Sequence, residues 1–190
     1  MLTLGANLDG GVWYYDGNPV VLIFLIRSDS DGYRIPLGDY AADQLEAVGF
    51  TIDRRYVTSS QASALWISSN PAEGLWSIYT GAWSATVIDR DEGDNFQFFY
   101  SPNSAFGFSP LWQAYDPIPE FLDLMDDLAY NSFTTMAERD AAFEQALEFA
   151  LEDSVHVWLV DGKQYLSRSV SVSAAYDLAA GVARLWPYTL

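Results

Sequence analysis

The clearest hydrophobic pattern lies in the first third of the chain. Val20–Ile26 is a continuous run of β-branched, aliphatic and aromatic residues, which is typical of a strand covered on both faces. Tyr40–Val48 follows with helical spacing, because its apolar residues share one face: Ala41, Leu45 and Val48. Phe50–Val57 alternates apolar and charged residues and predicts a second strand. A strand, a helix and a strand in fewer than 40 residues predict a βαβ unit and therefore a parallel sheet.

Turn and cap residues set the predicted borders of these elements. Asp16–Pro19 has the composition of a turn and precedes the first strand. Asp39 is placed to cap the start of the helix, and Gly49 is placed just after its end. These signals agree with the hydrophobic pattern on either side of them.

The middle of the chain is less regular. A short helix is predicted around Gln61–Ile67, and a third strand over Leu75–Trp83. The next segment, Ser84–Pro110, is rich in Asp, Asn, Gly and Ser, which predicts an irregular connection. Connections of that length tend to be functional or disordered. Its five Phe and one Tyr favour an ordered loop that packs on another part of the protein.

Two helices and a last strand complete the pattern. Ile118–Tyr130 is predicted to be helical and to bury Phe121, Leu122, Met125 and Leu128. The next helix opens with a capping box formed by Thr135 and Glu138. Its predicted buried stripe consists of Phe143, Ala146, Leu147, Ala150 and Leu151. Ser154–Val160 has strand chemistry, so the whole pattern predicts an α/β fold with a mostly parallel central sheet flanked by helices.

The charge balance narrows the class of partner. The 190 residues include 26 Asp and Glu against nine Lys and Arg, a net charge of −17. Nucleic-acid binding needs clustered cations, and the sequence has no such cluster, so that class is excluded. The same charge disfavours anionic ligands and mildly favours cationic or zwitterionic ones. The chain has no Cys, which excludes disulfides, thiolate metal sites and Cys nucleophiles.

Two features bear on location. The longest apolar run, 19–26, is too short to cross a bilayer. The segment that begins at Met1 lacks the basic and long apolar stretches of a signal peptide. Two interpretations stay open at this point: a protein that remains inside the cell, or a chain cut from a longer precursor.

Catalytic and metal-binding patterns are weak. The densest carboxylate cluster is 89–94, but a calcium loop counted from Asp89 would need Gly where Asp94 stands and Glu where Tyr100 stands. His156, the single histidine, lies between two valines and is interpreted as a packed structural residue. Nucleophile-elbow, Walker and dinucleotide motifs are absent. We therefore expect no catalytic residue, no cofactor and no metal, with a carboxylate pair in 89–94 as the alternative.

The end of the third predicted strand is the best candidate for ligand binding. Ligands of α/β proteins gather beyond the carboxyl ends of the strands. Here the strand ends in Tyr79-Thr80-Gly81-Ala82-Trp83. Gly81 would permit close approach, and the ring of Trp83 would offer a face, unless Trp83 simply belongs to the core. Carboxylates of the following loop could hold an ammonium group.

The sequence also resembles the family 5 extracellular solute-binding proteins of ABC importers, the dipeptide- and oligopeptide-binding group. The resembling segments, in chain order, are Asp39–Leu45 with Gly49-Phe50, Asn70–Gly74, Trp76–Trp83, Gly93–Phe96, Ser109–Trp112 and Leu185–Tyr188. They span about residues 10 to 190. Each segment is weak by itself, and the shared order makes the resemblance specific.

The resemblance implies a fold and a domain organisation. Members of this family are longer and fold as two lobes with a ligand between them. Residues 1–190 would form a single α/β lobe of periplasmic-binding-protein type II, the C-terminal one, with 1–19 and 161–190 as edge or connecting segments. The N-terminal lobe and the secretion signal would then precede Met1.

The resemblance also implies a site and a function. Peptide-binding relatives have a Gly-Trp-x-x-Asp segment whose Asp pairs with the peptide amino terminus; here Trp83 is followed by Thr86 at that place, and Asp89 comes later. The implied ligand-binding residues are Tyr79, Thr80, Gly81, Trp83, Asp89 and Asp91. The implied function is binding of a small solute, such as an oligopeptide, and its delivery to a membrane permease.

Three consequences and two alternatives follow. The protein would be no enzyme, it would be periplasmic or extracellular, and it would reach the membrane only through its transporter. One alternative is a carboxylate-dependent hydrolase that uses the 89–94 loop. The other is a module that binds another protein through exposed aromatic residues.

Overall fold

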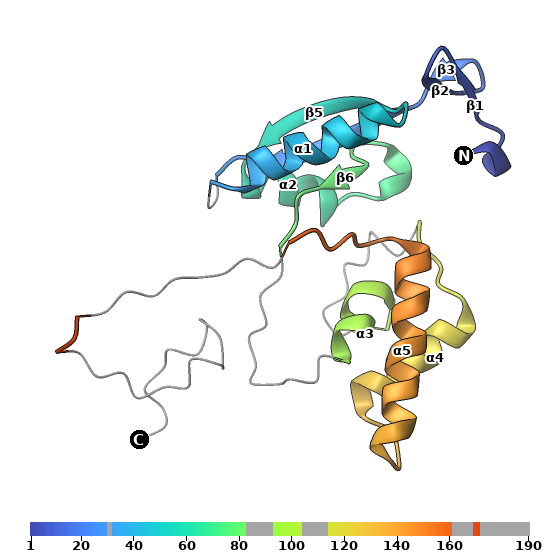
Figure 1. Ribbon diagram of the computed structural model, residues 1–190, viewed down its shortest axis with the longest axis vertical. Coiled ribbons are helices and arrows are strands. Elements are labelled where there is room, and N and C mark those ends of the chain that lie inside the picture. The colour runs from blue at the N-terminus through green and yellow to red at the C-terminus, as the bar shows by residue number, and fades with distance from the viewer. Residues whose placement is uncertain (30–31, 83–92, 104–113, 161–168, 172–190) are drawn as a thin grey trace. The chain divides into compact units, whose positions relative to one another are not determined.

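The computed structural model describes residues 1–29, 32–82, 93–103, 114–160 and 169–171. Figure 1 labels the helices and strands. By internal contacts the chain divides into two compact units, one built mainly from residues 1–82 and the other mainly from residues 93–103 and 117–160. A single lobe over 1–190, with edge segments at 1–19 and 161–190, stays a prediction.

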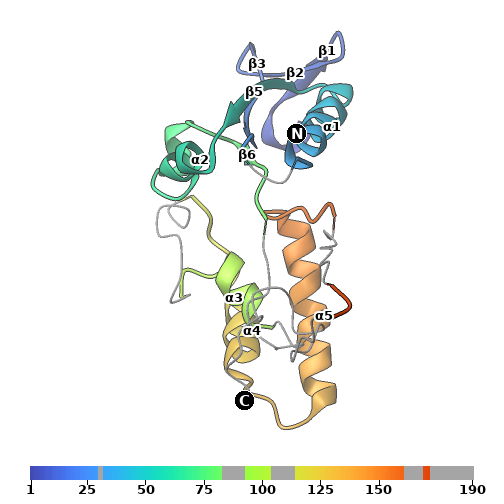
Figure 2. The same ribbon diagram turned by 90° about the vertical axis from the view of Figure 1, so that its left-hand side faces the viewer.

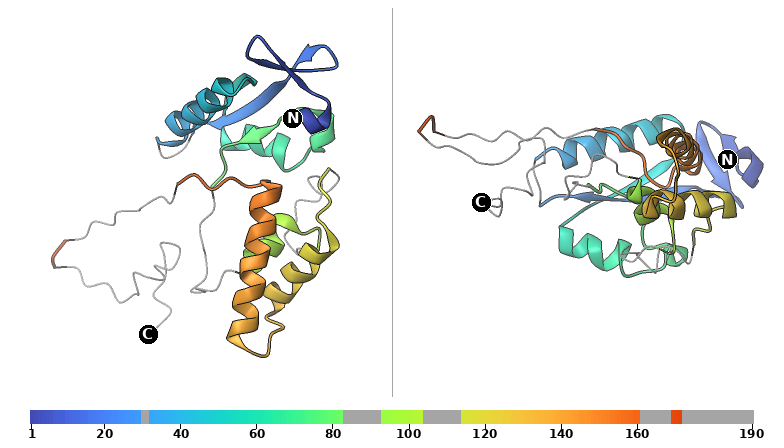
Figure 3. Two further views of the ribbon diagram at one scale, coloured as in Figure 1. Left: turned by 45° about the vertical axis from the view of Figure 1, so that its right-hand side comes forward. Right: turned by 90° about the horizontal axis from the view of Figure 1, so that it is seen from below.

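A parallel three-stranded sheet is the centre of the first unit. Its strands are β4 (Val21–Arg27), β5 (Thr51–Val57) and β6 (Ile78–Tyr79), in the order β5-β4-β6. Both neighbours of β4 run parallel to it. Helices α1 (Arg34–Ala47) and α2 (Ser59–Trp66) lie on opposite faces of this sheet (Figures 2 and 3). The α/β class, the parallel sheet and the βαβ unit are therefore confirmed.

The strand β4 is covered on both sides, as its unbroken apolar run predicts. Phe24 and Ile26 form one cluster with Ala42 of α1, and all three side chains are buried. Leu25, which points to the opposite face, is also fully buried. A central strand with helices on both faces has no polar side, which explains why this run shows no alternation.

The helix α1 starts earlier than its pattern predicted. Its N-cap is Tyr33, so the expected cap at Asp39 is wrong. Asp39 lies inside the helix, and its carboxylate accepts a hydrogen bond from the Tyr56 hydroxyl at 2.6 Å. The prediction for Gly49 is confirmed, because this residue follows the C-cap with φ of 102°.

The buried face of α1 is also rotated from the expected one. Arg34, Gly38 and Ala42 are its buried positions, whereas Val48 is 58% exposed. A Cβ atom on Gly38 would lie 2.8 Å from Cγ2 of Ile26. The small residues Gly38 and Ala42 let the helix approach the sheet closely. The hydrophobic pattern did not reveal this face, because neither residue is large and apolar.

The edge strand β5 is polar toward α1. Arg54 makes ion pairs with Asp43 and Glu46 of the helix, both at 2.6 Å. Within the strand, Asp53 and Arg55 form a further pair at 2.6 Å. Charged side chains of this kind blunt a sheet edge against pairing with another strand.

A small antiparallel sheet precedes the parallel one. It consists of β1 (Asn7–Asp9), β2 (Val12–Tyr15) and β3 (Asn18–Pro19), after the single turn Leu2–Leu4. The turn predicted over Asp16–Pro19 is confirmed for Asp16 and Gly17, which both have positive φ, as a two-residue type I′ hairpin requires, whereas Asn18 and Pro19 belong to β3. Trp13 ties this sheet to the end of α1, because its indole donates to the Val48 carbonyl at 2.8 Å.

The third predicted strand is shorter than expected. Pairing with β4 covers 77–80, since the Ser77 and Thr80 amides donate to β4 carbonyls at 2.8 and 3.1 Å. The preceding turn, Pro71–Glu73, is capped by Asn70, whose side chain accepts from the Ala72 amide at 3.0 Å. The Asn70–Gly74 segment of the family resemblance is thus a structural turn.

The described residues of the second unit form three helices. They are α3 (Asp94–Tyr100), α4 (Pro119–Tyr130) and α5 (Met136–Asp153). The expectation of an irregular segment over 84–110 is wrong for α3, and the remainder of that segment outside 93–103 lies beyond the described residues. Phe96 and Tyr100, spaced four residues apart, are both buried and form the inner face of α3.

The packing of α5 differs from the predicted stripe. Its buried positions are Arg139, Ala142, Ala146 and Ala150, while Leu147 and Leu151 are 43% and 61% exposed. Alanines at successive i, i+4 positions leave room for the aromatic residues of α3 and α4. Phe121 of α4 is fully buried there and lies 5.6 Å from Phe149, ring centre to ring centre. The predicted strand over 154–160 is also wrong, because this segment is irregular.

The capping box of α5 allows a matched test. The Thr135 hydroxyl accepts from the Glu138 amide at 3.2 Å, and the Glu138 carboxylate accepts from the Thr135 amide at 3.0 Å. We expect Thr135→Ala to lower the free energy of unfolding by about 1 kcal/mol. Thr134→Ala is the control, because only the backbone amide of Thr134 bonds to Glu138. Equal urea midpoints for the two variants would contradict the assignment.

Candidate functional site

The strand order defines where a ligand would approach the first unit. The chain passes from the central strand β4 to β5, and then crosses to β6 on the other side. The reversal of direction lies between β4 and β6, beyond their carboxyl ends. Ligands of open α/β sheets bind at such a point. The predicted site at the end of the third strand therefore falls at the reversal.

Thr80 fixes the carboxyl end of β6 against β4. Its hydroxyl accepts a hydrogen bond from the Arg27 amide at 2.9 Å, and its own amide donates to the Leu25 carbonyl at 3.1 Å. The Thr80 carbonyl accepts from the buried Arg34 guanidinium at 3.4 Å. The methyl group of Thr80 lies 3.1 Å from where a Cβ on Gly38 would be. These contacts give Thr80 a positioning role at the strand end.

Tyr79 and Gly81, the candidates on either side of Thr80, differ in their contacts. The ring of Tyr79 stacks on the Trp66 ring of α2, with centroids 5.4 Å apart and planes 22° apart. Gly81 is exposed, and an added Cβ would meet only the Tyr79 ring at 3.9 Å, an ordinary contact. Within the described chain, Gly81 is therefore not required for space. Contact of either residue with a ligand stays a prediction.

A polar cluster at the same edge was missed by the sequence reasoning. The Asp29 carboxylate accepts from the Arg27 side chain at 2.8 Å and from the Ser59 amide, at the start of α2, at 3.0 Å. These two hydrogen bonds, the one from Arg27 first, hold the pKa of Asp29 below its usual range. The available signal was the position of Arg27 and Asp29 directly after the buried run.

Three of the predicted site residues follow Ala82 in the sequence. Trp83, Asp89 and Asp91 lie outside the described residues. Asp29 is thus the carboxylate that the described structure brings to this edge, and it is already paired with Arg27. In the described ranges, no three His, Cys, Asp or Glu residues are grouped closely enough to hold a metal ion.

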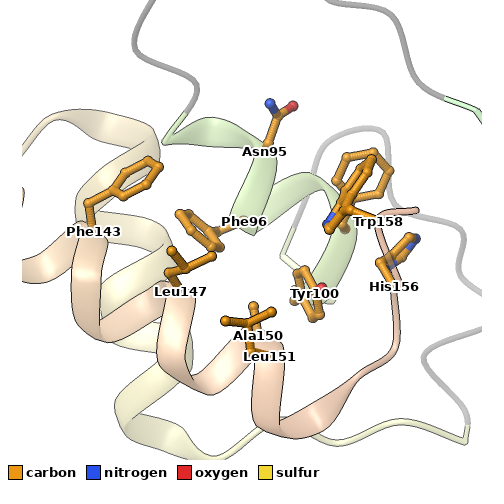
Figure 4. Close-up of a pocket in the computed structure, with 10 residues that line it drawn as sticks. Asn95, Phe96, Tyr100, Phe143, Leu147, Ala150, Leu151, His156 and Trp158 are labelled. Carbon is orange, nitrogen blue, oxygen red and sulfur yellow. The ribbon is translucent and has the colours of Figure 1, made fainter. Parts of the chain in front are cut away.

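The second unit has an apolar groove of about 180 Å³. Figure 4 shows it between α3, α5 and the segment that carries His156 and Trp158. Its lining residues are Asn95, Phe96, Phe99, Tyr100, Phe143, Leu147, Ala150, Leu151, His156 and Trp158. The sequence reasoning missed this groove because it expected Leu147 and Leu151 in the core and 154–160 in a strand.

His156 is packed among aromatic rings in this groove. Its ring centroid lies 4.7 Å from that of Phe99 and 6.0 Å from that of Trp158, nearly parallel to the latter. Its Nδ1 atom is buried and has no hydrogen-bond partner among the described residues. Burial lowers the pKa of His156 to about 4, so the imidazole is neutral near pH 7. The geometry agrees with the interpretation of a packed structural residue.

No protein-family model and no curated protein matches the sequence. The solved structures that share this fold over part of their length include three described by name. The oligopeptide-binding protein AppA from Bacillus subtilis, in complex with a nonapeptide, has a TM-score of 0.58 at 20% identity, over 80% of this chain and 28% of that one.

Two further similar structures concern nickel: one is named as a nickel ABC transporter, and the other is in complex with Ni(L-His). A nickel ABC transporter protein from Bacillus halodurans matches with a TM-score of 0.57 at 21% identity, over 82% of this chain and 29% of that one. NikZ from Campylobacter jejuni, in complex with Ni(L-His), matches with a TM-score of 0.58 at 13% identity, over 80% and 29%. This chain therefore spans less than a third of each of these proteins.

The likeness defines a class of fold. The chain is a mixed α/β structure that matches part of a periplasmic binding protein. More particularly, its structural neighbours are binding proteins of the family 5 type, which confirms the resemblance seen in the sequence at the level of the fold. No helix in the described part of the chain has both the length and the apolar character to cross a bilayer.

The role of Thr80 can be tested by removing its hydroxyl alone. Thr80→Val keeps the shape of the side chain and removes the acceptor for the Arg27 amide. We expect the free energy of unfolding to fall by about 1–3 kcal/mol, as for other partly buried donors deprived of their acceptor. Thr80→Ser keeps the hydroxyl and should lose less. Urea unfolding of both variants measures this, and a smaller loss in the Val variant would refute the positioning role.

Burial of His156 predicts a dependence of stability on pH. The ring titrates near pH 6.5 when unfolded and near pH 4 when folded, so the unfolded chain takes up the proton first as the pH falls. The stability contributed by the neutral ring is complete above about pH 6.5 and is lost as the pH falls toward 4. The expected loss is roughly 3 kcal/mol.

The matched variant is His156→Phe, which keeps a ring and cannot titrate. Urea unfolding of both proteins near pH 7 and near pH 4.5 gives the difference in pH dependence, in which the carboxylates common to both proteins cancel. A variant that loses as much stability on acidification as the parent would show that His156 is solvated in the folded protein.

Proposed function

We propose that this chain is part of an extracytoplasmic solute-binding protein that delivers its ligand to an ABC importer. The observation that carries the proposal is the reversal point between β4 and β6, in a fold shared with three solved binding proteins. The ligand would lie against the carboxyl ends of these strands. A second lobe would close over it by hinge motion, and the closed form would be presented to the permease.

The chemistry of the ligand follows from charge. The chain carries a net charge of −17, which disfavours anionic solutes. One solved neighbour is described in complex with a nonapeptide. An oligopeptide is zwitterionic, and its amino terminus suits a carboxylate of the loop after β6. We assign that role to Asp89 or Asp91, with Tyr79, Thr80, Gly81 and Trp83 lining the adjacent surface.

A binding titration on the protein expressed from its complete gene tests the proposal. The ligands are tri-alanine, N-acetyl tri-alanine and the nickel complex of L-histidine. We expect tri-alanine to bind and its acetylated form to bind at least about tenfold more weakly, because acetylation removes the charge that the carboxylate pairs with. Recovered peptide should be intact.

Variants locate the anchor. Either Asp89→Asn or Asp91→Asn should weaken tri-alanine binding by about tenfold or more. Asp123→Asn is the control, since Asp123 is exposed on α4. Cleaved peptide would favour the hydrolase alternative. Binding of the nickel complex without binding of any peptide would overturn the peptide assignment while leaving a solute-binding function.

A further inference from the structure

The groove of the second unit is an open apolar surface, and it is lined in part by His156 and Trp158, close to the end of the described range 114–160. Leu147, Leu151 and Trp158 are 43%, 61% and 62% exposed, above a floor that includes the buried rings of Phe96 and Tyr100. Apolar residues that gather in a concave surface usually mark an interaction site.

The segment that forms one wall continues this apolar character. In 154–160, the side chains of Val157, Leu159 and Val160 are each more than half exposed, as is Trp158. These residues lead directly into the last thirty residues of the chain. The groove and the segment beside it therefore expose apolar side chains just before residues 161–190.

The sequence of 172–190 is apolar enough to pack against such a surface. Thirteen of its 19 residues are Ala, Val, Leu, Trp or Tyr, and its charged residues are Asp177 and Arg184. In a helical conformation one face would contain Ala175, Leu178, Ala179, Val182 and Trp186. Asp177 and Arg184 would then lie on the opposite face.

Charge favours the approach of the tether, residues 161–171, which carries Lys163 and Arg168, while 172–190 itself is neutral. Between Asp161 and Leu190 the sequence has three cations, Lys163, Arg168 and Arg184, against two carboxylates, a net charge of +1 in a chain of −17. Between Met136 and Asp153, α5 has six carboxylates against Arg139, a net charge of −5. The tether is thus attracted to the helix that borders the groove.

We propose that residues 172–190 dock through this apolar face into the groove of the same molecule, against Leu147 and Leu151. Only 11 residues, 161–171, separate the segment from the wall at Val160. A tether that short gives an effective concentration in the millimolar range, which favours the chain's own segment over a second copy. The docked segment covers the groove and shields the ring of His156.

Site-directed cross-linking tests this docking on the full chain. Because the protein has no Cys, two introduced thiols are the only ones present. The test pair is Leu151→Cys with Val182→Cys, joined by a short bifunctional thiol reagent. We expect an intramolecular cross-link that forms at least about tenfold faster than in the control and at a rate independent of protein concentration, because the tether keeps the local concentration high.

The control pair is Met136→Cys with Val182→Cys. Met136 and Leu151 are similarly exposed, at 65% and 61%, and lie on the same helix. Fifteen residues separate them, about 22 Å along the axis. Equal rates for the two pairs would overturn the proposal, and so would cross-links between molecules that increase with concentration, which indicate a second copy. Leu147→Cys with Leu178→Cys repeats the test if the first pair impairs folding, as judged by circular dichroism.

Discussion

The architecture of the first unit depends on how the end of β6 is held beside β4. The two strands are parallel, so no tight turn joins them, and only a few backbone bonds pair them. The Thr80 hydroxyl adds one more bond by accepting from the Arg27 amide at 2.9 Å, just where the regular pairing stops. Gly38 allows α1 to come close enough to cover this junction. The edge at which a ligand would bind is therefore held by the Thr80 hydroxyl, by the Arg34 guanidinium that donates to the Thr80 carbonyl, and by the close approach of α1 that Gly38 allows.

Much of the first unit was predictable because its signals are strong and local. The buried run of β4, the alternating β5 and the glycine after α1 each have one physical interpretation, and the structure confirms them. The start of α1 was not predictable from a cap, because Tyr33 makes no side-chain capping bond. Its buried face was missed because it consists of Gly38, Ala42 and an arginine, none of which stands out in a hydrophobic pattern.

The second unit shows the limit of the same reasoning. Phe96 and Tyr100 form the face of a seven-residue helix that is too short for a periodic signal and depends on contacts with α4 and α5. In α5 the three alanines are buried and the two leucines border a groove, a distinction that depends on where α3 and α4 pack. At the candidate site, the position of the strand end was predicted from general rules for α/β sheets. The bonds of Asp29 to Arg27 and Ser59 were not predictable, because they depend on how the segments after β4 and β5 lie side by side.

The two edges of the parallel sheet differ in a way that limits how it can grow. The outer strand β5 presents Asp53, Arg54 and Arg55 in succession, and an incoming strand would have to displace their ion pairs. The opposite edge, β6, has only two strand residues, and both are uncharged and half-buried. Any wider sheet built on this framework would therefore extend past Ile78 and Tyr79, so that β4 would move toward its interior and the charged strand would stay at its rim.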